Sequence, residues 1–177
     1  MLDKTMPRLV VIPLSALGDS IAEHRPSHLV SLLSPQHMIA TPPGFPAERH
    51  LQLGVNDVAD PAGGEHPPSR AHVDALLAFS RGWDGRAPFM IHCWAGISRS
   101  MASAFIILCD RLGPGREEDI ARAMRRRAPH AAPNTLLVEH ADAALGRNGA
   151  MRLALMTMDP AVMVQEGVPT DLPLEGL

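Results

Sequence analysis

The sequence has 177 residues, of which 46% are hydrophobic and 20% charged, and its formal net charge is −3. This composition fits one ordinary globular domain, and the lack of a net basic charge argues against nucleic acid and membrane surfaces as partners. Aromatic residues make up only 3% of the chain, so few side chains could stack on single-stranded bases.

The first half of the chain alternates strands with connecting segments. Apolar runs at residues 8–14, 28–33 and 50–55 predict three strands, and residues 15–24 predict a short helix that ends before Pro26. Prolines and paired glycines then make residues 56–68 the most loop-like stretch. A loop of this length inside a compact domain is often functional. A helix is expected to begin near Ser69, which is a good N-cap residue.

The second half is mainly helical. The continuous apolar run at residues 87–92 predicts a strand that is buried on both faces. Residues 98–111 predict a buried central helix because almost the whole segment is apolar. Further helices are predicted at residues 116–129, at residues 134–146 with Asn134 as cap, and at residues 148–158.

This order of elements predicts the fold class. Strands alternate with helices before helices dominate, which indicates a single α/β domain over residues 1–158, with a small, mostly parallel central sheet flanked by helices. Residues 159–177 contain prolines and acidic residues, and we expect this tail to be poorly ordered.

Cysteine usage and the absence of long apolar stretches bear on location. Two cysteines, Cys93 and Cys109, are too few for a disulfide framework and suit a reducing compartment. No stretch reaches the roughly 18 apolar residues that span a bilayer, and the apolar residues near the N-terminus are interrupted by Pro13. We therefore expect a cytoplasmic protein.

The segment MIHCWAGISRSMAS, residues 90–103, carries the clearest chemistry. It joins a predicted strand to a predicted helix, whose N-terminus favours anions. Gly96 permits a tight backbone path, and Arg99 could bind two oxygens of a tetrahedral anion. The backbone N–H groups that could form the anion cradle belong to Trp94, Ala95, Gly96, Ile97 and Ser98.

The sequence HCWAGISRS resembles the signature of cysteine-dependent protein tyrosine phosphatases, and most of all their dual-specificity branch. In that signature His-Cys, five residues, Arg and Ser or Thr form the phosphate loop, HCX5R, in a phosphotyrosine phosphatase-like α/β fold. The order of elements over residues 28–146 also fits. The sequence departs from the pattern at Met101 and Ser103, which bears on helix packing rather than on chemistry.

The resemblance implies a role for each matching residue. Cys93 would be the nucleophile that forms a cysteinyl-phosphate, and Arg99 would bind the phosphate. Ser100 would donate a hydrogen bond to the sulfur, and His92 would orient the loop and support the thiolate. Such hydrolases of phosphorylated proteins or small phosphomonoesters need no organic cofactor and no metal, and the sequence itself has no metal-ligand cluster.

The leaving group requires a proton, which related phosphatases take from an aspartate upstream of the cysteine. The loop at residues 56–68 offers Asp57, Asp60 and Glu65. We favour Asp57, which directly follows the third strand, over Asp60. The ordinary alternative for each of them is a turn residue or a helix cap.

Two other functions share parts of this pattern. A phospho-binding module could keep the pocket without turnover, and a rhodanese-like sulfurtransferase also pairs a cysteine with an arginine. Ser100 and the upstream aspartate favour the phosphatase. The sequence leaves open phosphotyrosine-only against dual specificity. Cys109 is interpreted as a buried structural thiol, with a disulfide to Cys93 as the minor alternative.

Overall fold

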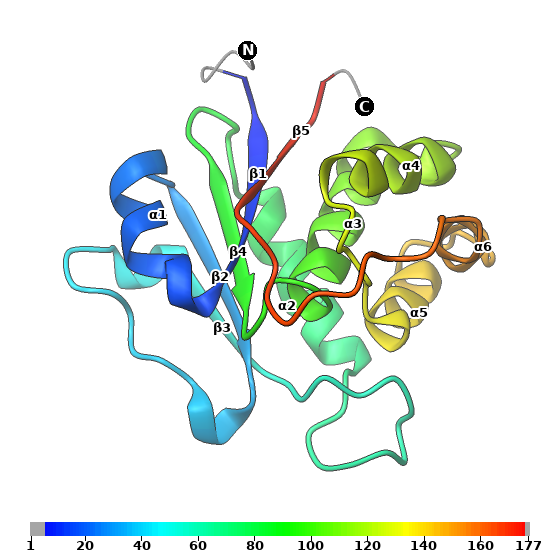
Figure 1. The fold of residues 1–177 in the computed structure, drawn as a ribbon, viewed down its shortest axis with the longest axis horizontal. Helices are drawn as coiled ribbons and strands as arrows, with labels where there is room; N and C mark the ends of the chain where they lie inside the picture. Colours follow the sequence, from blue (N-terminus) through cyan, green and yellow to red (C-terminus); the bar gives the residue numbers. More distant parts are fainter. Residues whose placement is uncertain (1–5, 176–177) are drawn as a thin grey trace.

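The computed structural model describes residues 6–175 as an α/β fold built on a five-stranded sheet (Figure 1). The strands lie in the order β3-β2-β4-β1-β5. Four of them are parallel, namely β1 (Arg8–Pro13), β2 (His28–Leu33), β3 (His50–Gly54) and β4 (Phe89–Cys93), and β5 (Thr170–Pro173) runs antiparallel to β1. The expected mostly parallel sheet is therefore confirmed.

Helices cover both faces of this sheet. One face carries α1 (Leu17–His24) and the other carries α2 (Arg70–Arg81), α3 (Arg99–Leu112), α4 (Glu117–Arg127), α5 (Thr135–Ala144) and α6 (Ala150–Met156) (Figure 1). Successive side chains of a strand point to opposite faces. In β1, Leu9 and Val11 therefore enter the larger core, while Val10 and Ile12 enter the smaller core beneath α1. Burial on both faces explains why these strands are apolar throughout.

The central helix α3 is the most buried helix that the structure describes. Every residue from Arg99 to Cys109 is buried. Met101 and Ser103, where the sequence departs from the phosphatase pattern, are both fully buried. The Ser103 hydroxyl donates to the carbonyl oxygen of Arg99 at 2.9 Å, so this polar side chain is satisfied within the helix.

The predicted elements are present, with ends that shift by a few residues. The first strand ends at Pro13 rather than residue 14, and β4 begins two residues later than expected. The last helix begins at Ala150 rather than residue 148, because Asn148 and Gly149 have φ values of 53° and 92°. These left-handed conformations are incompatible with a helix.

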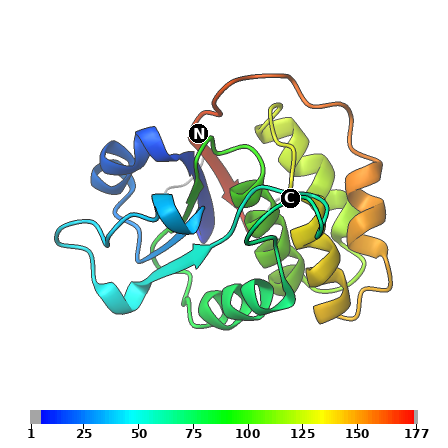
Figure 2. The same ribbon diagram turned by 90° about the horizontal axis from the view of Figure 1, so that it is seen from below.

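The segment after residue 158, expected from the sequence to be a poorly ordered tail, contains the strand β5, which was not predicted. The segment between α6 and β5 runs along the outside of the helical layer before it reaches the sheet (Figure 2). The open edge of β1 supplies the hydrogen-bonding partner for β5, and Asp171 accepts a hydrogen bond from Arg8 at 3.0 Å. Four residues that include a proline give too short a pattern to predict. The domain boundary at residue 158 stays a prediction.

No helix between residues 6 and 175 is both long enough and apolar enough to cross a lipid bilayer.

Candidate active site

The HCX5R segment joins a strand to a helix at the carboxyl end of the parallel strands. Cys93 is the last residue of β4 and Arg99 is the first residue of α3, so residues 94–98 form the connecting loop, here named the phosphate loop. Ligands of open α/β sheets usually bind at this end of the strands. The N-terminus of α3 also presents its unpaired N–H groups there.

Four of the five carbonyl groups of the phosphate loop are turned outward. They accept hydrogen bonds from surrounding segments: Trp94 from Leu14, Ala95 from Gly167, Ile97 from Ala132 and Ser98 from Asn134, at 2.8–3.3 Å. In a planar trans peptide the N–H points opposite to the C=O. The N–H groups that follow these carbonyls therefore face the interior of the loop, as an anion-binding nest requires.

Gly96 is required by the tight packing of this loop against β1. Its φ is +70°, and a Cβ atom there would lie 2.8 Å from the Pro13 nitrogen and 2.9 Å from the Ile12 carbonyl carbon. Any other residue would thus have a strained backbone conformation, and its Cβ atom would overlap the backbone of β1. Glycine holds the loop against the end of the sheet.

Cys93 and Ser100 are in direct contact. The Cys93 side chain is buried, and its Sγ lies 3.2 Å from the Ser100 Oγ. If the sulfur is a thiolate, the Ser100 hydroxyl must be the donor, because a thiolate has no hydrogen to give.

Cys109 has a different environment from Cys93. It lies deep in α3, where burial raises the pKa of its thiol. The Cys93 Sγ lies 3.2 Å from the Ser100 Oγ, and at a helical rise of about 1.5 Å per residue the nine residues from Ser100 to Cys109 span about 13 Å of α3. A disulfide needs Cα atoms within roughly 7 Å, so the folded chain does not favour the alternative of a Cys93–Cys109 bond, and both cysteines are free.

Arg99 is buried with an unsatisfied donor. Its Nη1 donates to the Val55 carbonyl at 2.8 Å, which fixes the guanidinium beside the end of β3. Its Nε has no hydrogen-bond partner and is shielded from solvent. Unpaired buried donors are uncommon in folded proteins. A phosphate oxygen in the phosphate loop is an acceptor of the right kind for this N–H.

Asp57 is the acidic residue that the structure brings to Arg99. Its Oδ1 accepts hydrogen bonds from the Ser98 hydroxyl at 2.7 Å and from the Asn134 amide at 2.9 Å. Its Oδ2 lies 3.8 Å from the Arg99 Nε. The Asp57 side chain is 37% exposed. One oxygen is therefore anchored, while the other faces the guanidinium and is open to a ligand.

The other acidic candidates lie elsewhere in the same loop. Asp60 is exposed, and its Oδ1 accepts from the Ala62 N–H at 2.9 Å, as a turn residue does. The Glu65 carbonyl accepts from the Asn56 side chain at 2.7 Å, and the Asn56 N–H donates to the His66 carbonyl. Asn56 thus joins the two ends of the loop, and neither Asp60 nor Glu65 is bonded to the phosphate loop in the structure.

His92 is fully buried and lies behind the phosphate loop. Burial lowers the pKa of its imidazole to about 4, so the ring is neutral near pH 7. Its Nδ1 lies 3.2 Å from the Cys93 carbonyl oxygen, and its Nε2 lies 2.6 Å from the Ser31 hydroxyl. A neutral ring supports Cys93 by positioning its peptide group rather than by charge.

A hollow of about 290 Å³ opens beside Arg99. Its exposed rim includes Trp94, which is 56% exposed and makes an edge contact with His37 at 5.8 Å between ring centroids. The residues that line it are Leu33, Ser34, His37, Trp94 and Arg99.

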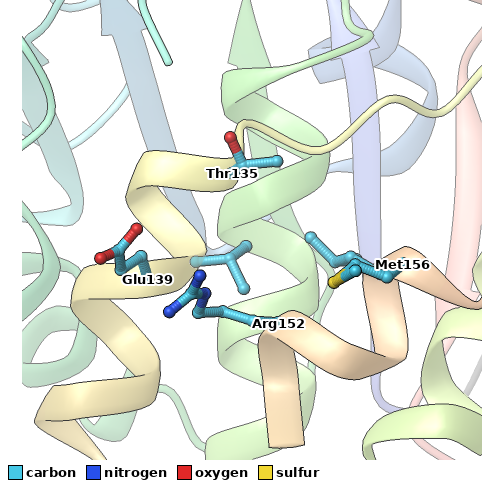
Figure 3. A pocket seen from close by; sticks show the side chains of 6 residues that line it. Thr135, Glu139, Arg152 and Met156 are labelled. Carbon is cyan, nitrogen blue, oxygen red and sulfur yellow. The ribbon is translucent and has the colours of Figure 1, made fainter. Parts of the chain in front are cut away.

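A second hollow, of about 320 Å³, lies between α5 and α6 (Figure 3). It is lined by Thr135, Val138, Glu139, Arg152, Leu155 and Met156. This second hollow is slightly larger, but no residue of the HCX5R segment lines it, whereas Trp94 and Arg99 line the hollow beside Arg99. The hollow beside Arg99 is therefore the candidate active site.

Asn134 has a second role beyond the helix cap predicted from the sequence. Its Oδ1 accepts from the Leu137 N–H at 3.0 Å, as a cap does. The amide Nδ2 additionally donates to Asp57 and to the Val58 carbonyl. An asparagine can cap a helix and donate at the same time, whereas an aspartate can only accept. That difference is the one signal in the sequence for this second role.

No three histidine, cysteine or acidic side chains between residues 6 and 175 are grouped closely enough to hold a metal ion.

Comparison with known proteins gives the fold a name. No family model and no curated protein matches the sequence. The crystal structure of DUSP15 is similar to 89% of this chain and 96% of its own, with a TM-score of 0.57 and 17% identity. The PTP-2 phosphatase of Cydia pomonella matches over 90% of this chain and 91% of its own, with a TM-score of 0.46 and 15% identity. The similarity to DUSP15 gives this chain a dual-specificity phosphatase-like fold.

Proposed function

We propose that this protein is a phosphomonoester phosphatase that acts through a covalent cysteinyl-phosphate. The observation that carries the proposal is the arrangement around Arg99. The buried Cys93 and the buried Arg99 stand at the two ends of a loop in which four of the five carbonyl groups are turned outward. The Arg99 Nε has no hydrogen-bond partner and lies 3.8 Å from the Asp57 carboxylate. Each group matches one requirement of phosphoryl transfer.

In the first step the Cys93 thiolate attacks phosphorus, and the bond between phosphorus and the ester oxygen breaks. The electron pair of that bond leaves with the oxygen, which takes a proton from Asp57. The inward N–H groups and Arg99 hold the three remaining oxygens as their charge changes. The anchoring of Asp57 through Oδ1 leaves Oδ2 to carry the transferred proton.

In the second step water attacks the cysteinyl-phosphate and gives its proton to Asp57. The bond between sulfur and phosphorus breaks, and Cys93 leaves as a thiolate that the Ser100 hydroxyl stabilises. The contact of 3.2 Å between the two side chains supports this role. The cycle returns the protein to its starting state without metal or cofactor.

The substrate class is a phosphorylated protein or a small phosphomonoester. The phosphate loop contains neither lysine nor arginine, and Arg99 directly follows it. Polyphosphorylated ligands need extra cations, so the loop does not favour them. Whether phosphotyrosine is preferred over phosphoserine and phosphothreonine depends on the walls of the hollow and is a question for direct assay.

The test is hydrolysis of para-nitrophenyl phosphate over the acid and neutral pH range, with reductant and with chelator. Wild type should turn over and Cys93→Ser should be inactive. Asp57→Asn should lose roughly 10²–10⁴-fold in kcat, the usual contribution of an acid–base group, and should lose its dependence on a protonated acid. Correctly folded wild type that shows no Cys93-dependent turnover would overturn the proposal.

Two further assays identify the alternatives if turnover is absent. Tight binding of a phosphopeptide without hydrolysis would indicate a phospho-binding module. Transfer of sulfur from thiosulfate to cyanide would indicate a sulfurtransferase, a reaction that gives no role to Asp57.

A further inference from the structure

Four side chains behind the phosphate loop form one continuous chain of hydrogen bonds, here named the hydroxyl–imidazole chain. Thr41 Oγ1 lies 2.9 Å from His50 Nδ1, and His50 Nε2 lies 2.8 Å from Ser31 Oγ. Ser31 Oγ also lies 2.6 Å from His92 Nε2, and His92 Nδ1 lies 3.2 Å from the Cys93 carbonyl oxygen. The chain thus ends on the peptide group of the proposed nucleophile.

The sheet register explains why these residues meet. Ser31 of β2 is the direct partner of His92 in β4, and His50 begins β3 on the other side of β2. Ser31 and His92 are fully buried, and His50 is 8% exposed. Polar groups buried in an apolar core are costly unless each is paired. Here each ring nitrogen has a partner, so the network is complete.

The partners fix the direction of every hydrogen bond. A carbonyl oxygen can only accept, so His92 Nδ1 must carry the hydrogen. Burial keeps the His92 ring neutral by lowering its pKa, which leaves Nε2 as an acceptor for the Ser31 hydroxyl. Ser31 has one hydrogen to give and therefore accepts from His50 Nε2. His50, whose pKa burial also lowers, then accepts from the Thr41 hydroxyl through Nδ1.

The far end of the chain lies in the segment that walls the hollow. Thr41 belongs to residues 34–49, between β2 and β3. The same segment supplies Ser34 and His37 to the hollow beside Arg99, and His37 contacts the Trp94 ring. Ile39 and Phe45 pack it against the smaller core, on the α1 face of the sheet. A substrate that contacts this wall would touch a segment that the hydroxyl–imidazole chain links to the Cys93 peptide group.

We propose that Thr41 and His50 are positioning residues for Cys93. Through Ser31 they fix the tautomer and orientation of His92, and so couple the wall formed by residues 34–49 to the peptide of the nucleophile. This inference rests on the proposed phosphatase function for its kinetic consequence, but not for its proton positions. Neither residue touches the reacting atoms.

The proton positions can be tested without any turnover. Long-range ¹⁵N–¹H spectra of the full chain near pH 7 distinguish the two neutral tautomers of histidine. We expect His92 with hydrogen on Nδ1 and His50 with hydrogen on Nε2. Thr41→Val should shift the ring nitrogens of both His50 and His92. Thr157→Val removes a similar threonine hydrogen bond to the Ala154 carbonyl and should shift neither.

The kinetic test uses the same variants with para-nitrophenyl phosphate. Thr41→Val should lower kcat about fivefold at unchanged KM, the factor that corresponds to one ordinary hydrogen bond. Thr41→Ser keeps the hydroxyl and should restore kcat, and Thr157→Val should match wild type. His50→Gln can accept from Thr41 and donate to Ser31, so it should retain more activity than His50→Leu.

Three results would overturn the proposal. They are a His50 ring with hydrogen on Nδ1, a His92 spectrum that does not respond to Thr41→Val, and a kcat that Thr41→Val leaves unchanged in an active enzyme. If wild type shows no hydrolysis at all, the proposed function fails, and the two spectra still decide whether the hydroxyl–imidazole chain exists and transmits its effect.

Discussion

The two loops that meet at Arg99 are held in opposite ways. The phosphate loop accepts four backbone hydrogen bonds from three segments, namely the residue after β1, the segment before α5 and the segment before β5. Gly96 also packs on the backbone of β1. The loop at residues 56–68 is mostly exposed and is held at Asp57 and Val58 and through Asn56. The phosphate loop therefore offers a fixed binding site for the anion, whereas the proposed acid Asp57 lies on a loop with few anchoring contacts. Many enzymes place a rigid binding site beside a loop that can move.

The largest expected effect comes from loosening the phosphate loop. Gly96→Ala should lower the free energy of unfolding by about 3 kcal/mol or more, because it combines backbone strain with overlap against β1. It should also abolish Cys93-dependent hydrolysis. Gly146 has a similar φ of +63° with open space around it, so Gly146→Ala isolates the backbone strain and should cost only about 1–2 kcal/mol. Urea unfolding measures both, and equal losses would contradict the close packing of Gly96.

The next effect is the pH dependence that His92 gives to the free energy of unfolding. Its pKa of about 4 in the folded protein lies below the ordinary 6.5, so the unfolded chain binds a proton that the folded protein excludes. His92 therefore contributes its full stability above pH 6.5, and about 3 kcal/mol is lost as the pH falls towards 4.

This contribution can be isolated with His92→Asn, in which the amide can still donate to the Cys93 carbonyl. Urea unfolding at several pH values should show a shallower loss of stability on acidification for the variant than for wild type. Parallel curves for the two proteins would mean that His92 is not held neutral by burial.

A smaller effect is expected from the hydrogen bonds by which Asn134 holds the loop at residues 56–68. Asn134→Ser keeps a helix-capping oxygen but loses the amide that donates to Asp57 and Val58. The kcat should fall about tenfold, because a misplaced acid loses part of its 10²–10⁴-fold contribution, while stability changes by less than about 0.5 kcal/mol. Asn134→Ala should lose both the cap and the link. An unchanged kcat in Asn134→Ser would show that Asn134 does not position Asp57 for catalysis.

The smallest effect is expected within the exposed part of the acid loop. Asp60→Asn keeps the oxygen that accepts from Ala62 and should leave kcat within about twofold, since a surface turn substitution usually changes little. Asp57→Asn in the same assay is the matched comparison. A large loss in Asp60→Asn together with a small one in Asp57→Asn would reverse the assignment of the acid.

The sequence is enough to predict the parts of this protein that depend on local pattern. Continuous apolar runs predict the parallel strands, and the spacing of Cys93, Gly96 and Arg99 predicts the strand, turn and helix of the phosphate loop. The contact of Asp57 with Ser98 is compatible with its place after β3. The strands and the phosphate loop thus follow from neighbouring residues or from a short motif.

The missed features all join residues that are distant in the sequence. β5 depends on the open edge of β1, and the second role of Asn134 depends on a carboxylate 77 positions away. The pairing of His50 with Ser31 depends on the order of strands in the sheet. A single sequence carries no local signal for such contacts, because they are set by how the elements pack.

The central claim is that the phosphate loop holds a phosphoryl group on Cys93. Wild type and Cys93→Ser should be mixed with para-nitrophenyl phosphate, stopped with acid within one turnover, and examined by mass spectrometry of the intact chain and its peptides. We predict one phosphoryl group on Cys93 in wild type and none in Cys93→Ser. Hydrolysis that proceeds in Cys93→Ser, or a phosphoryl group found on another residue, would contradict the account.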